Sequence, residues 1–388
     1  MTGCETVSIS KLKIGTKTDF DILNAQGRVL LKCGSFLTHH VVDRWIAGGF
    51  TKVLIRKPPA GSEPNLLVPY DAELLERVAQ VFSQVSSSIL QFASQLGEHS
   101  QAEVATIELL LDSLVSNINA DCDAAIFCAQ GISVDRFEIR NEKLARRCVQ
   151  MSALGTATAI VMDLPFEQCQ TVSLAGLFHD IALLNYLPGV EGRHDADIHR
   201  LHPLASARLL DSISTVSELT KTVVAEVHEQ SDGTGFPRGL SSSSLTVMSR
   251  ILNIVDAYLT LVDPDLEQTA FLPADVMTYL VFHTKSGHFD RECAGGFVRA
   301  MSIYPVGTRV ELDDAHTATV LRSSLTDAIC PIVRIDSPNQ PIVDLRKSAR
   351  CIVRPLPEVS GKHKRLPKSK LSEALWVVSP TASPDTHY

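Results

Sequence analysis

Apolar residues recur at spacings of three and four from about residue 70 to residue 302. Side chains at these spacings share one face of a helix, so the pattern predicts a long succession of amphipathic helices. We expect a mainly α-helical chain built around this region. The expected helices span 70–96, 103–119, 143–163, 171–185, 203–214, 217–230, 245–262 and 273–285.

The two flanks of the helical region instead show alternating, strand-like runs separated by turn residues. Asn24 to Gly27 interrupts the first flank, and Gly48-Gly49 ends a short predicted helix there. We therefore expect a helical bundle between two small units that contain strands. The predicted domains are 1–60, a small α+β domain; 61–139, a linker and helical segment; 140–302, the main helical domain; 303–356, a small β module; and 357–388, a basic tail expected to be disordered.

The charge and hydropathy of the chain exclude several classes of protein. The net charge of −8 leaves no excess of lysine and arginine to neutralise a phosphate backbone, so we expect no nucleic-acid polymer as partner. No window of eighteen residues is apolar throughout, and the first residues lack the apolar core of a signal peptide. The nine cysteines form no CxxC pair, which is typical of reduced thiols. We expect a cytoplasmic protein with no transmembrane segment.

Four ionisable sites fall in order along the helical region. His179-Asp180 lies inside the apolar stretch "LAGLFHDIALL", and His202 is expected at a helix start with Pro203 as its first helical residue. His228 is expected on the last turn of the next helix, and Asp256 lies in the apolar stretch "RILNIVDAYLTLV". A single buried histidine or aspartate is usually a hydrogen-bonded core residue. Four such sites favour a divalent metal ion, because imidazole and carboxylate ligands around a cation offset the cost of burying carboxylates.

The motifs then resemble a known family. The order His-Asp, His-Pro, His-Glu-x-x-Asp-Gly-x-Gly-Phe-Pro and Arg-Ile-x-x-x-x-Asp-Ala is similar to that of the HD-GYP family, over roughly residues 140–300. The resemblance implies an HD-type helical bundle and metal-dependent hydrolysis of cyclic di-GMP to pGpG or GMP. It also implies iron or manganese as the metal. The implied catalytic residues are His179 and Asp180.

By this resemblance, His179, Asp180 and Asp256 would hold one ion, and Asp180, His202 and His228 would hold a second. Each of these two sets lacks one histidine of the family pattern. Arg147 and Val227 stand where the missing histidines are expected. The site is therefore expected to hold a single ion or none, unless His194 or His199 substitutes as a ligand.

Two other positions depart from the family pattern. Leu183 replaces a lysine, and the acidic stretch 265–268 replaces basic residues that would contact phosphate. Arg147 itself has two interpretations, which the sequence leaves open. Its guanidinium cannot ligate a cation, so it either pairs with Asp180 or Asp256 or points to solvent beside Arg146.

The loop "DGTGFP" follows His228 and comprises Asp232, Gly233, Thr234, Gly235, Phe236 and Pro237. The two glycines allow positive φ angles, and Pro237 stiffens the exit. By resemblance the loop would lie near the site and contact a protein partner; the plainer interpretation is a connection retained for packing.

Two functions follow from the residues. The first is a divergent HD-GYP protein in cyclic di-GMP signalling with weak or lost phosphodiesterase activity, acting as a regulatory or partner-binding module. The alternative is an active metal-dependent phosphodiesterase. The partners that the resemblance allows are cyclic di-GMP, signalling proteins and a second copy of the chain.

Overall fold

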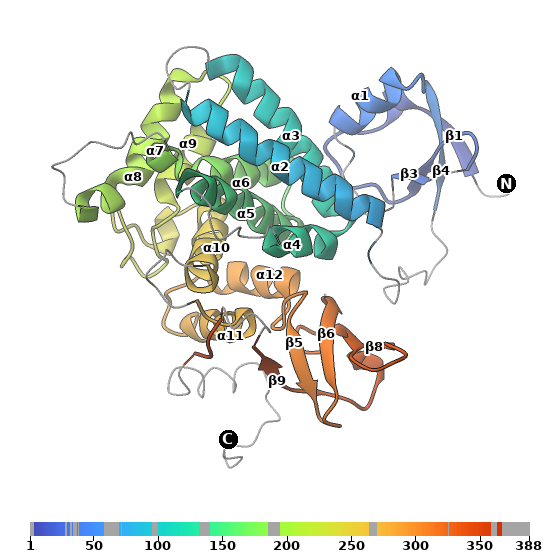
Figure 1. Cartoon of the computed structure of the whole chain (residues 1–388). Helices are drawn as coiled ribbons and strands as arrows, with labels where there is room; N and C mark the ends of the chain where they lie inside the picture. Colours follow the sequence, from blue (N-terminus) through green and yellow to red (C-terminus); the bar gives the residue numbers. More distant parts are fainter. Residues whose placement is uncertain are drawn as a thin grey trace.

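The structure is a computed structural model that describes residues 4–27, 29–31, 33, 37, 39–57, 70, 72–94, 100–131, 140–184, 195–263, 270–324, 326–357 and 363–366. It consists of a helical bundle with a small antiparallel sheet on either side of it along the chain (Figure 1). The helices are α1 (His39–Ala47), α2 (Ala72–Ser94), α3 (Ser100–Ala120), α4 (Cys122–Gly131), α5 (Arg140–Val161), α6 (Phe166–Phe178), α7 (Ile181–Leu184), α8 (Asp195–Leu209), α9 (Glu218–Glu226), α10 (Val247–Val262), α11 (Pro273–His283) and α12 (Arg291–Met301).

The strands form two separate sheets, which confirms the predicted mainly α class with a small α+β unit before the bundle and a small β module after it. The first sheet has the order β1-β4-β2-β3, and the second has the order β8-β7-β6-β5-β9. The boundaries predicted for the domains remain proposals. The strands are β1 (Cys4–Ser8), β2 (Asp21–Leu23), β3 (Val29–Leu31), β4 (Lys52–Arg56), β5 (Arg309–Leu312), β6 (Thr317–Arg322), β7 (Ile332–Ile335), β8 (Ile342–Asp344) and β9 (Ile352–Leu356).

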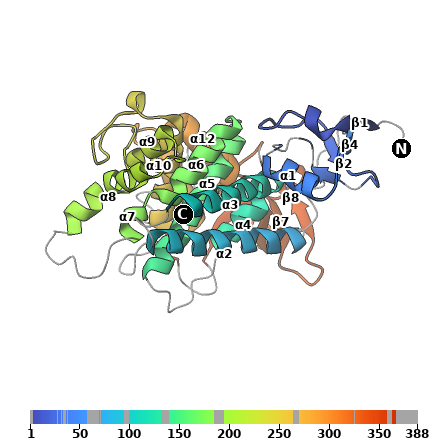
Figure 2. The same ribbon diagram turned by 90° about the horizontal axis from the view of Figure 1, so that it is seen from above.

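Helix α5 is the central element of the bundle. It packs against α2, α4, α6, α10 and α12, and its buried residues belong to one hydrophobic core that extends from α2 to α12. Seen from above, α8 lies at the edge of the bundle away from the N-terminal sheet (Figure 2). Within the described residues, no helix combines the length and apolar character needed to cross a bilayer.

Side-chain caps fix where three of the helices begin. The hydroxyl of Ser217 accepts a hydrogen bond from the Thr220 backbone N–H at the start of α9, and Thr246 accepts one from the Ser249 N–H at the start of α10. The Asp290 carboxylate accepts from two backbone N–H groups at the start of α12. Each cap satisfies donors that have no partner within the helix.

Several predicted elements differ from those observed. Helices α4 and α12 were not predicted as separate elements, and the helix predicted over 171–185 breaks at His179-Asp180 into α6 and α7. The helix predicted to start at Pro203 begins at Asp195, so Pro203 lies inside α8. The polar residues that open α8 show no apolar period, and this concealed its first two turns.

The predicted disordered tail is also wrong in one part. Residues 363–366 pack against the bundle: Leu366 is buried in the main core, and its backbone N–H donates to the Asp275 carboxylate. The Lys364 N–H donates to the Ala270 carbonyl. These contacts tie the chain back to α11 after it leaves β9.

A polar junction fixes the C-terminal β module to the bundle. The Arg322 guanidinium donates two hydrogen bonds of 2.6 Å to Asp121, which precedes α4, and lies 4.2 Å from the centroid of the Tyr70 ring. The Ser323 hydroxyl donates to the buried Asp123 carboxylate. Burial raises the pKa of Asp123 to about 6, while the hydrogen bond from Ser323 opposes that rise.

We predict that Gly176→Ala destabilises the protein, because a Cβ at this position would lie 2.9 Å from the backbone N and Cα of Ser152 on α5. Backbone atoms cannot move aside as a flexible side chain can, so the free energy of unfolding should fall by about 1–3 kcal/mol in chemical denaturation. Gly295→Ala on α12 is the matched control. Its Cβ would meet only the end of the Arg299 side chain, at 3.7 Å, and its stability should be unchanged or slightly higher. Equal destabilisation of the two variants would contradict this account of the α5–α6 contact.

Candidate metal site

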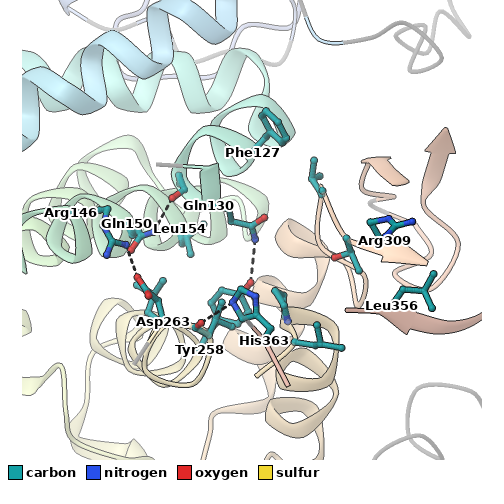
Figure 3. Close-up of a pocket in the computed structure, with 18 residues that line it drawn as sticks. Phe127, Gln130, Arg146, Gln150, Leu154, Tyr258, Asp263, Arg309, Leu356 and His363 are labelled. Carbon is teal, nitrogen blue, oxygen red and sulfur yellow. Dashed lines mark hydrogen bonds and ion pairs between the residues drawn. The ribbon is translucent and has the colours of Figure 1, made fainter. Parts of the chain in front are cut away.

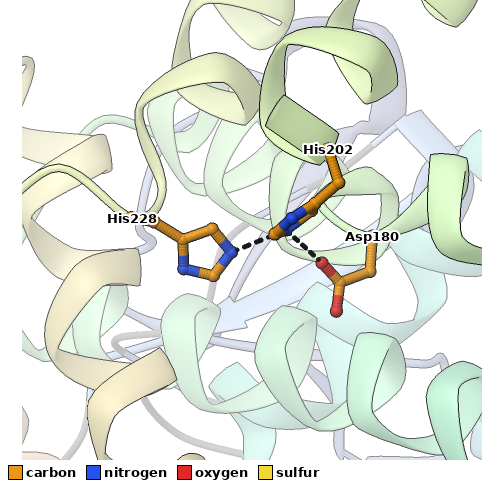
Figure 4. Close-up of side chains that lie close together, drawn as sticks. All are labelled: Asp180, His202 and His228. Atoms are coloured by element: carbon orange, nitrogen blue, oxygen red, sulfur yellow. Dashed lines mark hydrogen bonds and ion pairs between the residues drawn. The ribbon is translucent and has the colours of Figure 1, made fainter. Parts of the chain in front are cut away.

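Three ligand-type side chains lie close together in the helical bundle (Figure 4). Asp180 lies in the turn between α6 and α7, and His202 lies within α8. His228 was predicted on the last turn of a helix, but α9 ends at Glu226, so His228 lies just beyond it. Asp180 and His228 thus lie outside the helices, whereas His202 projects from within α8.

The geometry of this cluster suits a divalent cation. The Nε2 atom of His202 lies 3.0 Å from Asp180 Oδ1 and 2.9 Å from His228 Nε2. One ligand atom from each of the three residues lies within 4.8 Å of the other two. Two imidazoles and a carboxylate form a donor set suited to zinc, iron or manganese.

His179 is buried beside this cluster. Its Nδ1 atom lies 2.7 Å from the Gly176 carbonyl, to which it donates when it carries the proton, and its Nε2 atom lies 3.1 Å from Asp180 Oδ2. Among the residues that the structure describes, neither His179 Nε2 nor Asp180 Oδ1 makes a hydrogen bond of acceptable geometry. Buried polar atoms normally have partners, so these two atoms fit a site where a cation would bind.

His179 and Asp180 each stabilise the charged form of the other. Burial alone would raise the pKa of Asp180, but the neighbouring His179 and His202 imidazoles lower it well below its usual range. Burial would lower the pKa of His179, but the Asp180 carboxylate raises it above its ordinary value. A cation would take over the role of the His179 proton, because a ligating imidazole must be neutral.

Arg147 faces the site, which decides between its two interpretations. Its Nη2 atom donates to Asp256 Oδ1 at 2.6 Å and to the Thr260 hydroxyl at 2.7 Å. The alternative that it points to solvent is wrong. Its neighbour Arg146 is also buried, and its Nη1 atom donates to Asp263 Oδ2 at 2.5 Å.

The second oxygen of Asp256 orients His228. Asp256 Oδ2 lies 2.9 Å from His228 Nδ1, which donates to it, so the Nε2 atom of His228 is directed toward His202. Burial raises the pKa of Asp256, but the positive charges of His228 and Arg147 outweigh burial and hold that pKa well below its ordinary value. The structure therefore gives Asp256 two partners, and the cluster of Asp180, His202 and His228 forms without it.

The remaining positions singled out by sequence have these locations. Leu183 is half-buried on α7, and Val227 is fully buried in the main hydrophobic core. The side chains of His194 and His199 and the acidic stretch 265–268 lie outside the described residues.

The loop after His228 packs closely on the backbone that carries this ligand. A Cβ at Gly235 would lie 2.3 Å from the Gln230 backbone nitrogen and 2.5 Å from the His228 carbonyl oxygen. The expectation of positive φ holds for Gly233, at +79°, whereas Gly235 is needed for this close approach. The Phe236 ring stacks on the His228 imidazole, with ring centroids 4.9 Å apart.

The Phe236 backbone N–H donates to the His228 carbonyl at 3.1 Å, and further hydrogen bonds stabilise the loop. Asp232 accepts hydrogen bonds from Thr234 and lies 3.0 Å from His288 Nδ1, and Pro237 follows Phe236 into the loop exit. Sequence reasoning missed Glu229, whose fully buried carboxylate accepts from the backbone N–H groups of Arg238 and Leu240, at 2.7 and 2.8 Å. The signal in the sequence was the position of Glu229, directly after His228 and shortly before a glycine-containing loop whose backbone N–H groups need acceptors.

Comparisons with known proteins agree with this geometry. Residues 134–293 match the HD domain family. The chain therefore contains an HD domain. It is 26% identical over 284 residues to the cyclic di-GMP phosphodiesterase PA4108 of Pseudomonas aeruginosa. The matched region covers 71% of this chain and 66% of that protein.

Two further relatives match shorter regions. The cyclic di-GMP phosphodiesterase PdeB of Borreliella burgdorferi is 21% identical to this chain, and the matched region covers 54% of this chain and 56% of that protein. The 3'3'-cGAMP-specific phosphodiesterase 3 of Vibrio cholerae is 27% identical to this chain, and the matched region covers 34% of this chain and 29% of that protein. The chain thus spans less than two thirds of the length of each of the three relatives.

We predict that Gly235→Ala displaces the loop from His228, because the added methyl group would collide with the backbone at 228–230. The variant should lose about 1–3 kcal/mol of stability in chemical denaturation. Ser244→Ala, at an exposed position shortly after the loop, is the control and should keep the stability of the wild type within about 0.5 kcal/mol. A Gly235→Ala variant as stable as this control would show that the loop can leave His228 without cost.

Proposed function

We propose that this protein acts in cyclic di-GMP signalling as a regulatory HD-GYP protein. In this proposal its site holds one divalent metal ion and has weak or no phosphodiesterase activity. The observation that carries the proposal is the ion pair between Arg147 and Asp256, at 2.6 Å. Cyclic di-GMP comes from the relatives, two of which are named as its phosphodiesterases.

The ion pair reduces the number of metal ions that the site can hold. A metal ion at Asp256 would have to displace a guanidinium that already neutralises this carboxylate, and it would then experience repulsion from that fixed charge. The cluster of Asp180, His202 and His228 has no such competitor among the contacts described above. It is the position that we assign to a single ion.

Each side chain around the cluster has a role in this proposal. Asp256 fixes the orientation of His228, as carboxylates commonly do for ligating histidines, and Arg147 keeps Asp256 charged and in place. A bound divalent ion would supply Lewis-acid polarisation of a phosphodiester oxygen. Phe236 covers one face of His228 and restricts the access of water to it. A regulatory protein would use the same arrangement to recognise a cyclic dinucleotide.

The alternative is an active metal-dependent phosphodiesterase. The convergence of Asp180, His202 and His228, with His179 buried beside them, favours it. In that case iron or manganese would be the expected metal, and Arg147 would contact the anionic substrate. The partners in either case would be cyclic di-GMP, signalling proteins or a second copy of this chain.

An assay of cyclic di-GMP hydrolysis separates the two functions. Wild-type protein supplied with Mn²⁺ or Fe²⁺ should form pGpG no faster than a His202→Ala variant, with the products followed by chromatography. Binding of cyclic di-GMP to the wild type should still be detectable by calorimetry. Wild-type turnover ten-fold or more above that of His202→Ala would overturn the proposal and establish the phosphodiesterase.

Substitution of Arg147 provides a second test of the same proposal. Arg147→His removes the fixed charge and adds an imidazole next to Asp256, so turnover should rise above that of the wild type. Arg147→Lys keeps the positive charge and should leave turnover at the wild-type level. If the two variants behave alike, the charge of Arg147 does not limit the chemistry.

A further inference from the structure

A cavity of about 230 Å³ lies between the bundle and the C-terminal β module (Figure 3). Its walls come from α4, α5 and α10 on one side and from the segment that enters β5 on the other. Asp180, His202 and His228 are not among its lining residues. The polar junction of Arg322 with Asp121 fixes the two walls relative to each other.

The lining of this junction cavity is mostly apolar. Aliphatic and aromatic side chains, Tyr258 among them, form its walls (Figure 3). An engineered apolar cavity of about 150 Å³ is large enough to hold benzene. The junction cavity therefore has room for a bicyclic ring. The principal apolar residues are Leu154, Tyr258, Leu259, Val262, Val306 and Leu356.

Most of the polar groups in the lining are already engaged with one another. Arg146 and Asp263 form a buried ion pair, so together they present no net charge to the cavity. Gln150 Nε2 donates to the Ala129 carbonyl at 2.9 Å, and Gln130 Nε2 donates to the Tyr258 hydroxyl at 3.2 Å. Arg309 also lines the cavity, and its Nη2 atom lies 3.7 Å from Asp336 Oδ2. A charged ligand would therefore have to compete with these ion pairs to offset the cost of its own desolvation.

Thr308 differs from these engaged polar groups. Its Oγ1 atom is buried and makes no hydrogen bond to any part of the chain that the structure describes. A buried hydroxyl without a partner costs free energy, so this atom marks the position where a ligand would offer a complementary group. An N–H donor on the ligand would satisfy it.

We propose that the junction cavity binds a small, uncharged, mostly apolar ligand of about the size of a bicyclic aromatic ring, which donates one hydrogen bond to Thr308 Oγ1. The size comes from the volume, the neutrality from the internal pairing of Arg146 with Asp263, and the donor from the Thr308 hydroxyl.

The cavity also shares two helices with the metal site. Arg146 faces the cavity and Arg147 pairs with Asp256, so adjacent residues of α5 reach the two sites. Asp256 lies on α10 and Asp263 directly follows its last residue, and these two carboxylates receive the two arginines. A ligand against the Arg146–Asp263 pair would therefore contact the residue next to Arg147 on α5, about two helical turns from the ion pair at Asp256.

Calorimetric titration of the full-length protein with indole, the probe that matches this size and donor, tests the proposal. The wild type should bind indole saturably and should bind 1-methylindole, which lacks the N–H group, about five-fold more weakly. Val306→Phe fills the cavity and should abolish binding. Val353→Phe adds the same ring at an exposed position of β9 and should bind indole as the wild type does.

A second variant keeps the test decisive if Val306→Phe does not fold, which thermal denaturation would show. Thr308→Val preserves the shape of the cavity but removes the acceptor. It should weaken indole binding about five-fold and leave 1-methylindole binding unchanged. Absence of saturable indole binding to the wild type, or equal binding by Val306→Phe and Val353→Phe, would overturn the proposal. Equal affinities for indole and 1-methylindole would overturn the contact with Thr308.

Discussion

The Asp256 carboxylate connects Arg147 on one side with His228 on the other, and the arrangement of the site depends on this shared contact. One oxygen accepts from the guanidinium at 2.6 Å, and the other accepts from the imidazole at 2.9 Å. The carboxylate thereby fixes the tautomer and direction of His228 while its own charge is balanced by Arg147. The consequence is a permanent cation beside a cluster of potential ligands. Under our proposal, this cation takes the place of one of the metal ions of a binuclear site.

The bundle supplies the rigid frame that these contacts require. The close approach of α6 to α5 at Gly176 and Ser152 sets the position of the turn that carries His179 and Asp180. On the other side, the buried Glu229 and the tight packing of Gly235 hold the loop against His228. The turn at Asp180 and the segment at His228 are thus each held by a backbone contact that tolerates little change, while His202 and Asp256 project from within α8 and α10.

Much of the site could be predicted from the sequence. The order of the His-Asp, His-Pro and His-Glu motifs identified the residues that converge, since helical periodicity placed them on apolar, packed segments. Pairing of Arg147 with Asp180 or Asp256 was one of two interpretations that the sequence left open, and only the structure identifies Asp256 as the partner. The anchoring role of Glu229 escaped prediction, because it depends on backbone N–H groups whose positions are known only after the loop folds.

The fold was predicted less completely at its edges. The polar start of α8 carried no apolar period, and α4 and α12 lie beyond the ends of the helices predicted over 103–119 and 273–285. The packing of residues 363–366 on α11 depends on contacts about ninety positions away in the chain, such as Arg365 with Asp275. The junction cavity is likewise formed by residues from distant segments, which no local pattern reveals.

The number of metal ions bound per chain tests the central claim most directly. The purified protein would be loaded with Mn²⁺ or Fe²⁺, freed of excess metal by gel filtration and measured by inductively coupled plasma mass spectrometry, with a His202→Ala variant in parallel. Our account predicts one ion per chain in the wild type and a large loss of metal in the variant. Two ions per wild-type chain would contradict it, because Arg147 would then not have replaced a metal ion beside Asp256; no bound ion at all would contradict the assignment of Asp180, His202 and His228 as a metal site.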